Sequence, residues 1–425
     1  MPRPHLFRPL AAGLLTLCSV ATAAAAVPVE RVRQLAEREQ APLLRTLEQL
    51  VGLESGSRDL AGLEQIARML ADRLAALGGR VERVAPSPEI QRMSDTPAQV
   101  GGSVQATFTG TGTRTILLLA HMDTVYPRGT LARQPFRIAG DRAYGVGIAD
   151  NKHGNAVILH VLALLQALDF RGYRTITVLI NGDEELGSPG SRQILTRLGA
   201  EHDVVLSFDG PIGPDHLLLA TSGIAAATLR VQGRGSHAGI APERGVNALY
   251  ELSHQLLQLR DLSEPDRGLK VNWTMAQAGV TRNMIPPEAT ASADIRVLRV
   301  EDYDRIERTL RARITRKLLP EAVVSLDFER RRPPLEATAA SRKLATRAQA
   351  IYRELGRDLT VQDRPEGGGT DAAFAALQAR GPVVENFGLQ AFGAHSTNDE
   401  YVLISSIVPR LYLATRLIME LERGD

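Results

Sequence analysis

Cysteine is nearly absent from this chain. The single cysteine among 425 residues is Cys18, inside an apolar N-terminal segment. A mature chain that begins after this segment therefore has no disulfide, no thiolate nucleophile and no cysteine-based zinc site. Long apolar runs are also lacking, because residues 9–21 are too short to span a bilayer comfortably and no other segment comes close. We expect a soluble protein that makes no membrane contact after processing.

The N-terminus has the pattern of a secretory signal. Arg3 and Arg8 precede the apolar residues 9–21, and the small residues Ala24-Ala25-Ala26 stand directly before Val27. This order predicts cleavage ahead of Val27 and a periplasmic or secreted location. The alternative is a lipoprotein signal that ends at Cys18, but a bulky leucine stands before this cysteine, where a small residue is required.

An excess of charge of either sign is lacking too. The chain has 50 Lys and Arg against 48 Asp and Glu. Two of the arginines lie in the predicted signal, so the mature balance is 48 against 48. The short run Arg330-Arg331-Arg332 is typical of a solvated or ligand-facing segment and not of a nucleic-acid groove. We therefore expect no nucleic-acid partner.

The hydrophobic pattern indicates an α/β fold. Short apolar runs typical of buried strands alternate with helical patterns: strand 115–120, helix 152–168, strand 175–180, helix 191–198 and strand 204–208. This alternation predicts a mixed, largely parallel sheet flanked by helices.

Near residue 222 the pattern changes to several strands and two helices, and the first pattern returns near residue 335. The expected strands of this block are 226–232, 269–278 and 289–297, and its helices are 245–259 and 301–318. The expected elements after it are helix 339–355, helix 371–379, strand 382–387 and helix 404–422. We therefore expect an inserted α+β domain: signal 1–26, first catalytic part 27–221, insertion 222–333 and second catalytic part 334–425.

Acidic and histidine side chains follow the expected strands. They are His121, Asp123, Asp150, Asp183, Glu184, Glu185, Asp209 and His395. Each has a simpler explanation alone, such as a polar turn, a helix N-cap or an exposed acidic loop. Open α/β sheets place their sites at strand ends, and this ligand set suits two divalent cations. Motifs for a serine nucleophile, a phosphate loop or a dinucleotide are lacking.

Six segments together resemble the co-catalytic zinc metallopeptidases, and most strongly the exported, folate-hydrolysing glutamate carboxypeptidases. The similar segments are His121–Tyr126, Gly147–Lys152, Asp183-Glu184-Glu185, Ser236-His237-Ala238-Gly239, Gly367–Asp371 and Gly393-Ala394-His395-Ser396. The resemblance implies a zinc exopeptidase that releases a C-terminal amino acid, glutamate above all, from N-acyl or peptide substrates with a free carboxylate.

The resemblance also implies roles for individual residues, with two Zn²⁺ per chain. His121, Asp150 and Asp209 would hold one ion, and Asp150, Glu185 and His395 the other. Glu184 would be the general base and acid, and Asp123 would orient His121. A cis peptide bond would join Asp150 to Asn151.

The inserted block would be the dimerisation or lid domain of a homodimer, and the resemblance implies that some of its residues contact substrate. His237, Asn283 and Arg296 belong to this set, and Gly368 and Thr370 form a turn that faces the substrate.

One departure leaves alternatives open. The resembling carboxypeptidases have glutamate where this chain has Asp209, and aspartate there accompanies aminopeptidases and dipeptidases more often. An aminoacylase or dipeptidase therefore remains an alternative, as does a periplasmic solute-binding protein with two α/β lobes. The sequence does not fix the substrate side chain.

Overall fold

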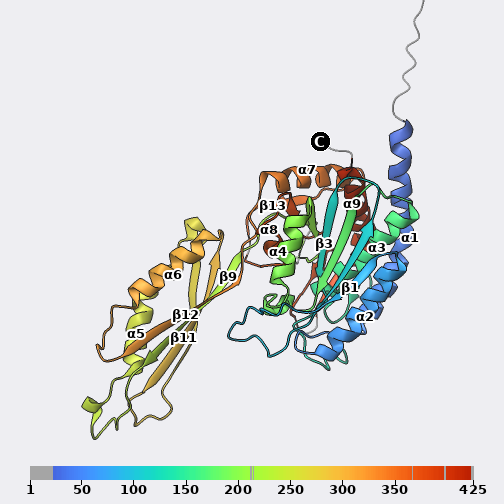
Figure 1. Ribbon diagram of the computed structural model, residues 1–425. Coiled ribbons are helices and arrows are strands. Elements are labelled where there is room, and N and C mark those ends of the chain that lie inside the picture. Colours follow the sequence, from blue (N-terminus) through green and yellow to red (C-terminus); the bar gives the residue numbers. More distant parts are fainter. Residues whose placement is uncertain (1–22, 211–212, 214, 366, 397–398, 423–425) are drawn as a thin grey trace, which may run out of the picture.

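The computed structural model describes residues 23–210, 213, 215–365, 367–396 and 399–422. The chain forms a larger α/β part and a smaller part that extends to one side of it (Figure 1). Most of the expected signal lies outside the described residues, although the first helix, α1, begins at Ala23. No described helix is long and apolar enough to cross a membrane.

A six-stranded sheet forms the centre of the larger part. Its order is β1-β2-β6-β3-β7-β14, in which β6, β3, β7 and β14 are parallel and β2 is antiparallel to both its neighbours. The strands are β1 (Arg80–Val84), β2 (Ser103–Thr109), β3 (Thr115–His121), β6 (Thr175–Asn181), β7 (Val204–Ser207) and β14 (Val383–Val384). The expectation of a largely parallel sheet is confirmed.

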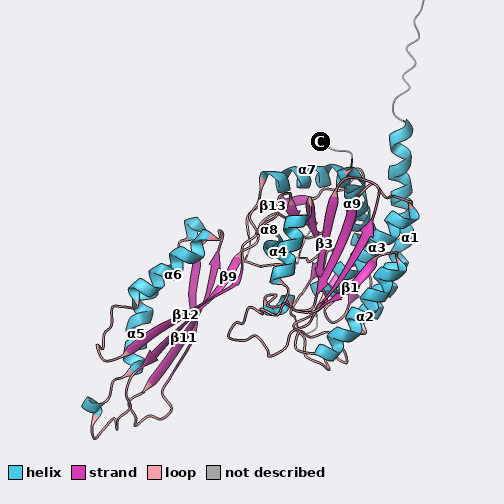
Figure 2. Cartoon of the chain, viewed as in Figure 1, coloured by secondary structure: helices cyan, strands magenta, loops and turns pink. Residues whose placement is uncertain are grey.

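Helices cover both faces of this sheet, as the alternation along β3 requires (Figure 2). Ile116 and Leu118 belong to one hydrophobic core, whereas Leu117 and Leu119 belong to the core on the opposite face. The first core contains α1 (Ala23–Val51), α2 (Leu60–Ala76), α3 (His153–Ala167), α7 (Ala339–Arg353) and α9 (Ile407–Leu421), and the second contains α4 (Arg192–Glu201) and α8 (Ala372–Ala376).

The smaller part is a second, antiparallel sheet with two helices and a hydrophobic core of its own. The sheet order is β10-β11-β9-β12. Alternate residues of β9 are buried against the helices, and Leu229 and Ile295 are fully buried in this core. The elements are β9 (Gly223–Gln232), α5 (Ala248–Leu259), β10 (Lys270–Ala278), β11 (Glu288–Val297), α6 (Glu301–Arg313) and β12 (Val323–Arg332). The fold class with an inserted α+β unit is therefore confirmed.

Two small sheets complete the larger part. β8 (His216–Leu218) is parallel to β13 (Thr360–Gln362). The other sheet has the order β15-β16-β5-β4, with β4 (Arg137–Ala139), β5 (Arg142–Tyr144), β15 (Ala391–Phe392) and β16 (Tyr401–Leu403). The loop between β15 and β16 carries His395.

Several helices and strands are shorter than the sequence predicts. The helix expected over 301–318 ends at Arg313, ahead of a turn that leads to Pro320. The helix expected over 371–379 is only Ala372–Ala376, and the strand expected over 382–387 is only Val383–Val384. In these short elements the apolar run in the sequence continues past the regular helix or strand. The predicted element is therefore longer than the observed one.

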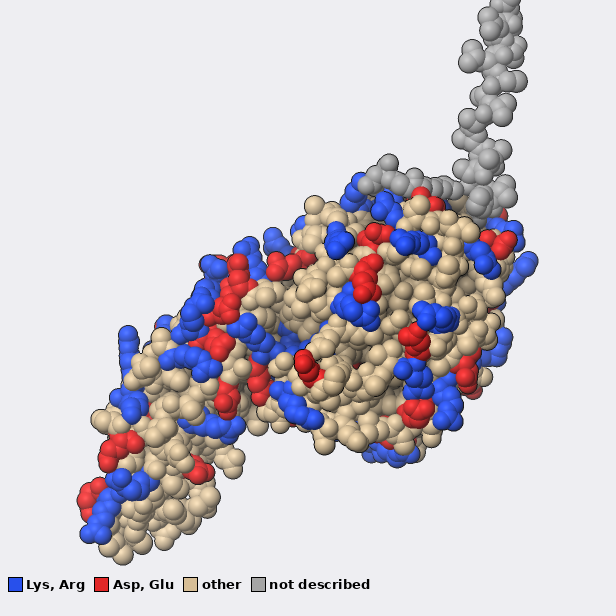
Figure 3. Space-filling view, in the orientation of Figure 1, with Lys and Arg blue, Asp and Glu red and all other residues tan. Residues whose placement is uncertain are grey.

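The charged side chains are dispersed over the surface. Figure 3 shows Lys and Arg interspersed with Asp and Glu over the face in view. This agrees with the near-zero charge balance of the sequence.

Candidate metal centre

Five candidate ligands meet at the ends of strands and in the loops beside them. His121 is the last residue of β3, Asp150 precedes α3, Glu185 follows β6, Asp209 follows β7, and His395 follows β15. They form two groups, His121–Asp150–Asp209 and Asp150–Glu185–His395. Within each group the potential ligand atoms lie within 4.8 Å of one another.

Asp150 belongs to both groups and presents a different oxygen to each histidine. Its Oδ1 lies 2.9 Å from Nε2 of His121, and its Oδ2 lies 3.2 Å from Nε2 of His395. Asp209 Oδ1 is 3.6 Å from the same nitrogen of His121, and Glu185 Oε1 is 3.4 Å from that of His395. A carboxylate shared in this way is the arrangement of two-metal hydrolases.

The turn before α3 leaves the Asp150 side chain available. The side-chain oxygen of Asn151 accepts a hydrogen bond from the Gly154 N–H, in the first turn of the helix, at 3.1 Å. Glu400 accepts the backbone N–H groups of Gly147, Ala149 and Asp150 at 2.9, 2.9 and 3.1 Å. The peptide bond between Asp150 and Asn151 is cis. Asn151 therefore binds the first turn of α3, whereas the Asp150 carboxylate faces His121 and His395.

Asp123 lies behind His121 and is fully buried. Its backbone oxygen is 3.0 Å and its Oδ1 is 3.3 Å from Nδ1 of His121, which leaves Nε2 toward Asp150. The same carboxylate accepts hydrogen bonds from Ser57 Oγ at 2.8 Å and from the backbone N–H groups of Glu184 and Glu185 at 3.1 Å. Asp123 thus fixes both the ring and the neighbouring acidic turn.

The electrostatics of the cluster favour bound cations. Burial raises the pKa of Glu185 to about 7, and hydrogen bonds to Asp150 and Glu185 raise the pKa of His395 to about 11. Burial opposes the charge of Asp150, but hydrogen bonds from His121 and His395 more than offset this and lower its pKa. The carboxylates of Asp150, Glu185 and Asp209 thus favour positive charge on the imidazoles of His121 and His395.

The donor set fits two zinc ions. Imidazole nitrogens and carboxylate oxygens are ligands that zinc accepts. Glu185 Oε1 is buried and faces His395 Nε2 at 3.4 Å, so a buried acceptor is available in the second group. In the first group, Asp150 and Asp209 lie on the same nitrogen of His121.

Glu184 belongs to neither group and faces a buried arginine. Its Oε1 is 2.6 Å from Arg332 Nη1, and Arg332 Nη2 donates to its backbone oxygen at 2.8 Å. Of the two roles expected for the run Arg330–Arg332, the solvated one is wrong for Arg332, whose side chain is 6% exposed. The sequence offers no signal that separates it from Arg330 and Arg331.

Cavities flank the cluster on two sides. A cavity of about 280 Å³ is lined by Asp150 and Asp209 together with His216, Gly368 and Thr370. A second cavity of about 510 Å³ is bounded by Glu185 and by residues near the start of α2 and after β3, among them Ser57, Tyr126 and Arg128. The predicted turn Gly368–Thr370 therefore lies beside the candidate ligands.

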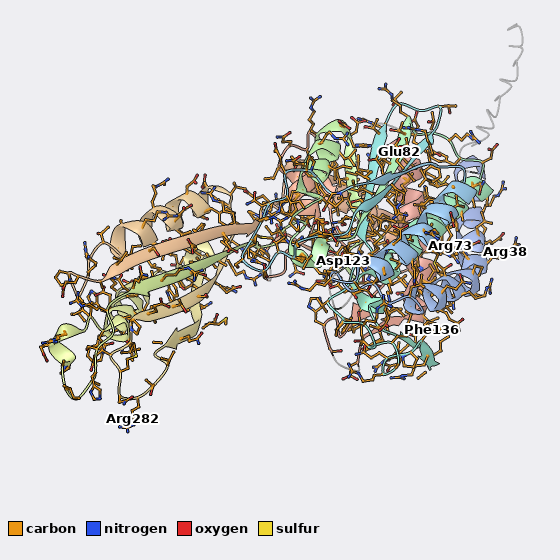
Figure 4. The ribbon with its side chains drawn as sticks, turned by 60° about the horizontal axis from the view of Figure 1, so that its bottom comes forward. Arg38, Arg73, Glu82, Asp123, Phe136 and Arg282 are labelled. Carbon is orange, nitrogen blue, oxygen red and sulfur yellow. The ribbon has the colours of Figure 1, made fainter. Side chains whose placement is uncertain are left out.

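The other predicted substrate residues lie elsewhere. His237 is exposed and its Nδ1 accepts the N–H groups of Gly239 and Ile240 at 3.1 Å. Asn283 accepts the Ala238 N–H at 3.0 Å, so both belong to one end of the inserted part. Figure 4 labels Arg282 at that end, far from Asp123.

Arg296 lies between these extremes. It pairs with Asp294 at 2.8 Å and donates to the Gly367 oxygen at 2.7 Å. The structure therefore brings Arg296 next to the turn Gly368–Thr370, while it leaves His237 and Asn283 distant from the ligands of their own chain.

Two solved peptidase structures have a similar fold. Aminopeptidase PepT from Bacillus cereus has a TM-score of 0.74 at 22% identity, with 90% of this chain and 98% of that chain covered. The YxeP protein of Bacillus subtilis, described as a dinuclear metal-binding peptidase of family M20, has a TM-score of 0.64 at 14% identity, with 92% and 100% covered.

Comparison of sequences assigns the family. Carboxypeptidase G2 from Pseudomonas sp. strain RS-16 is 45% identical over 424 residues, which cover 99% of this chain and 100% of the relative. The model of peptidase family M20/M25/M40 matches residues 117–420. This match contains all five candidate ligands, and the chain belongs to peptidase family M20/M25/M40.

Proposed function

We propose that this chain is a dizinc exopeptidase that hydrolyses an amide bond and releases a C-terminal amino acid, glutamate above all, from N-acyl or peptide substrates such as folates. The observation that carries this proposal is Asp150, whose two carboxylate oxygens face the two histidines of two ligand groups. The 45% identity to Carboxypeptidase G2 supports the carboxypeptidase reaction.

In this proposal the ligand sets are the two observed groups. His121, Asp150 and Asp209 hold one zinc, and Asp150, Glu185 and His395 hold the other. Asp123 orients His121 through Nδ1, as the 3.0 and 3.3 Å contacts support. Zinc bound there supplies a Lewis acid and lowers the pKa of an attacking water.

Glu184 carries the proton in the proposed reaction. Its carboxylate accepts a proton from the water that attacks the scissile carbonyl, and it returns this proton to the nitrogen of the leaving amine. Its position beside Glu185, but outside both ligand groups, supports this role. The hydrogen bonds from the backbone to Asp123 hold the turn that carries both residues.

The substrate side chains are proposed to lie in the two cavities, with Gly368 and Thr370 at the wall of the smaller one. Arg296 is the proposed partner of the substrate carboxylate, because a guanidinium binds a carboxylate through two parallel hydrogen bonds. Arg296 donates a hydrogen bond to the Gly367 oxygen, so it lies next to the turn that lines the smaller cavity.

We propose a homodimer formed through the inserted part. The edge strand β10 exposes Met275, and helix α5 exposes Tyr250 and Leu257, with exposed fractions of 71%, 62% and 62%. Exposed apolar groups on an edge strand and on a neighbouring helix favour contact with another copy. His237 and Asn283 lie far from the metal-ligand groups of their own chain, so we propose that they reach the site of the partner subunit.

Residues 1–26 are proposed to be a cleaved signal that directs the enzyme to the periplasm. Mass spectrometry of the exported protein tests this directly: a mature chain that starts at Val27 supports the proposal, and an intact Met1 contradicts it.

A substrate panel tests the reaction. Purified protein with zinc present is assayed on N-acyl-glutamates, N-acetyl-amino acids and dipeptides. Turnover of N-acyl-glutamates supports the carboxypeptidase, whereas preference for the other two classes assigns an aminoacylase or a dipeptidase, which Asp209 keeps as the alternative. Binding without turnover and without metal would indicate the solute-binding alternative, which has no use for this ligand cluster.

A further inference from the structure

Arg332 connects the inserted part to the candidate base. It is the last residue of β12, a strand that pairs with β9 in the inserted sheet. Its guanidinium is buried and touches two carboxylates, Glu184 Oε1 at 2.6 Å and Asp371 Oδ1 at 3.2 Å. In the described part of the chain, Arg332 is the partner of the Glu184 carboxylate. The position of this carboxylate therefore depends on where the guanidinium is held.

Asp371 contacts the same guanidinium nitrogen, Nη1, as Glu184 does. Its Oδ2 accepts a hydrogen bond from Asn181 Nδ2 at 2.7 Å, and its Oδ1 accepts one from the Ser188 hydroxyl. Asn181 is the last residue of β6, and Ser188 follows the Glu184–Glu185 turn. Asp371 is itself buried. Its carboxylate is thus fixed by the strand that carries the acidic turn.

We propose that Asp371 is a positioning residue, which holds Arg332 so that Arg332 keeps the Glu184 carboxylate beside the metal ligands. This inference rests on the proposed role of Glu184 as general base. Asp371 ends the segment Gly367–Asp371, and it belongs neither to the two ligand groups nor to the lining of the two cavities. The proposal assigns a role to it.

The physical reason is the balance around one buried guanidinium. Arginine cannot give up its charge, so a buried arginine requires carboxylates or other acceptors around it. Here two carboxylates share one guanidinium nitrogen, Nη1, so its charge is divided between Glu184 and Asp371. If the charge of Asp371 is removed, Glu184 becomes the remaining carboxylate partner, and the ion pair tightens around Glu184. The base is then drawn from its working position.

Asp371→Asn tests the proposal because it keeps the shape and removes the charge. A displacement of about 1 Å in catalytic geometry lowers rates by up to about 100-fold. We expect kcat to fall by about 10–100-fold, KM to stay within about threefold, and zinc to remain near two per chain. The matched control is Asp304→Asn, which removes the carboxylate 2.5 Å from Arg330 on the same strand. Its kcat should be unchanged.

Coupling between residues separates positioning from a general structural role. Glu184→Asp shortens the base and breaks its contact with Arg332, so Asp371→Asn added to it should lower kcat by less than about threefold more. Independent, multiplied effects would overturn the proposal. So would a rise in KM with unchanged kcat, because Asp371 would then act on substrate binding.

A milder variant guards against a misfolded Asp371→Asn protein. Ser188→Ala removes one hydrogen bond to Asp371 and keeps its charge, so we expect a smaller fall in kcat with zinc retained. An unchanged kcat in a folded Ser188→Ala and a folded Asp371→Asn protein would overturn the proposal. The Glu184→Gln variant decides the proposed function separately: full activity there would refute the general base, whatever Asp371 does.

Discussion

Glu184 and Glu185 are neighbours in the chain, but their carboxylates face different partners. Glu184 Oε1 lies 2.6 Å from Arg332, and Glu185 Oε1 lies 3.4 Å from Nε2 of His395. Burial raises the pKa of both side chains. Two adjacent acids can therefore divide the work, one at a metal and one carrying a proton.

Glu184→Gln should abolish most turnover and leave zinc near two per chain. Removal of a general base lowers the rate by about 10²–10⁴-fold, because the proton of the attacking water loses its acceptor. Steady-state kinetics beside metal analysis of the same preparation check this. Loss of a zinc would show that Glu184 is a ligand and not the base.

Glu185→Ala and His395→Ala should each lose one zinc and most activity, because each removes a donor from the second ligand group. His160→Ala is the control, since His160 is buried between Glu39 and Thr46, at 2.6 and 2.8 Å, and lies outside both groups. It should keep both zinc ions, although loss of its hydrogen bonds lowers stability by about 1–3 kcal/mol. Equal zinc loss in all three variants would contradict the ligand assignment.

The proposed contribution of His237 to the partner site predicts complementation. Subunits with Glu184→Ala and subunits with His237→Ala are dissociated, mixed and reassociated. A mixed dimer contains one site with both residues intact, so part of the activity should return. A mixture as inactive as its parents, in which mass spectrometry shows mixed dimers, would refute the shared site. In the His237→Ala variant, kcat should change more than KM, because His237 is proposed to act as a donor in the transition state.

His153 predicts a loss of stability in acid. Burial lowers the pKa of His153 to about 4 from its ordinary value of 6.5. Its Nε2 lies 3.1 Å from the Ala149 oxygen and its Nδ1 accepts the Leu389 N–H at 3.0 Å, so the folded ring is neutral. Between pH 6.5 and 4 the unfolded chain binds the proton and the folded chain does not. The contribution of His153 to the free energy of unfolding is therefore complete above pH 6.5 and is lost toward pH 4, by about 3 kcal/mol.

Urea unfolding at several pH values measures this. The His153→Gln variant should be less stable near pH 7, because it loses one or both ring contacts, and its stability should depend less on pH between 6.5 and 4. An unchanged slope would show that other groups carry the acid effect. The measurement concerns folding alone and needs no substrate.

That the candidate ligands lie close together was predictable from local patterns, whereas their division into two groups came from the family resemblance. His121, Glu185 and Asp209 each follow an apolar strand, and parallel strands end at one edge of the sheet. Asp150 was ambiguous between a ligand and a helix cap, and the neighbouring Asn151 resolved this by accepting the Gly154 N–H. Burial of the strands was similarly readable, whereas the exposed strand β1 carries little apolar signal.

Arg332 was not predictable in this way. Its sequence neighbours Arg330 and Arg331 pair with Asp304 and Asp95 at 2.5 and 2.7 Å, and both are more exposed than Arg332. Only the return of β12 to the larger part carries the third arginine under the acidic turn. Such a contact joins residues 148 positions apart, so it depends on the tertiary fold and not on local spacing.

The unequal cavities on the two sides of the ligand cluster give the site a direction. A substrate that enters with its larger portion toward Glu185 meets about 510 Å³, whereas the reverse orientation must fit the same portion into about 280 Å³ beside Asp209. In the proposed reaction, this difference in volume favours one orientation of a substrate whose two portions are unequal in size.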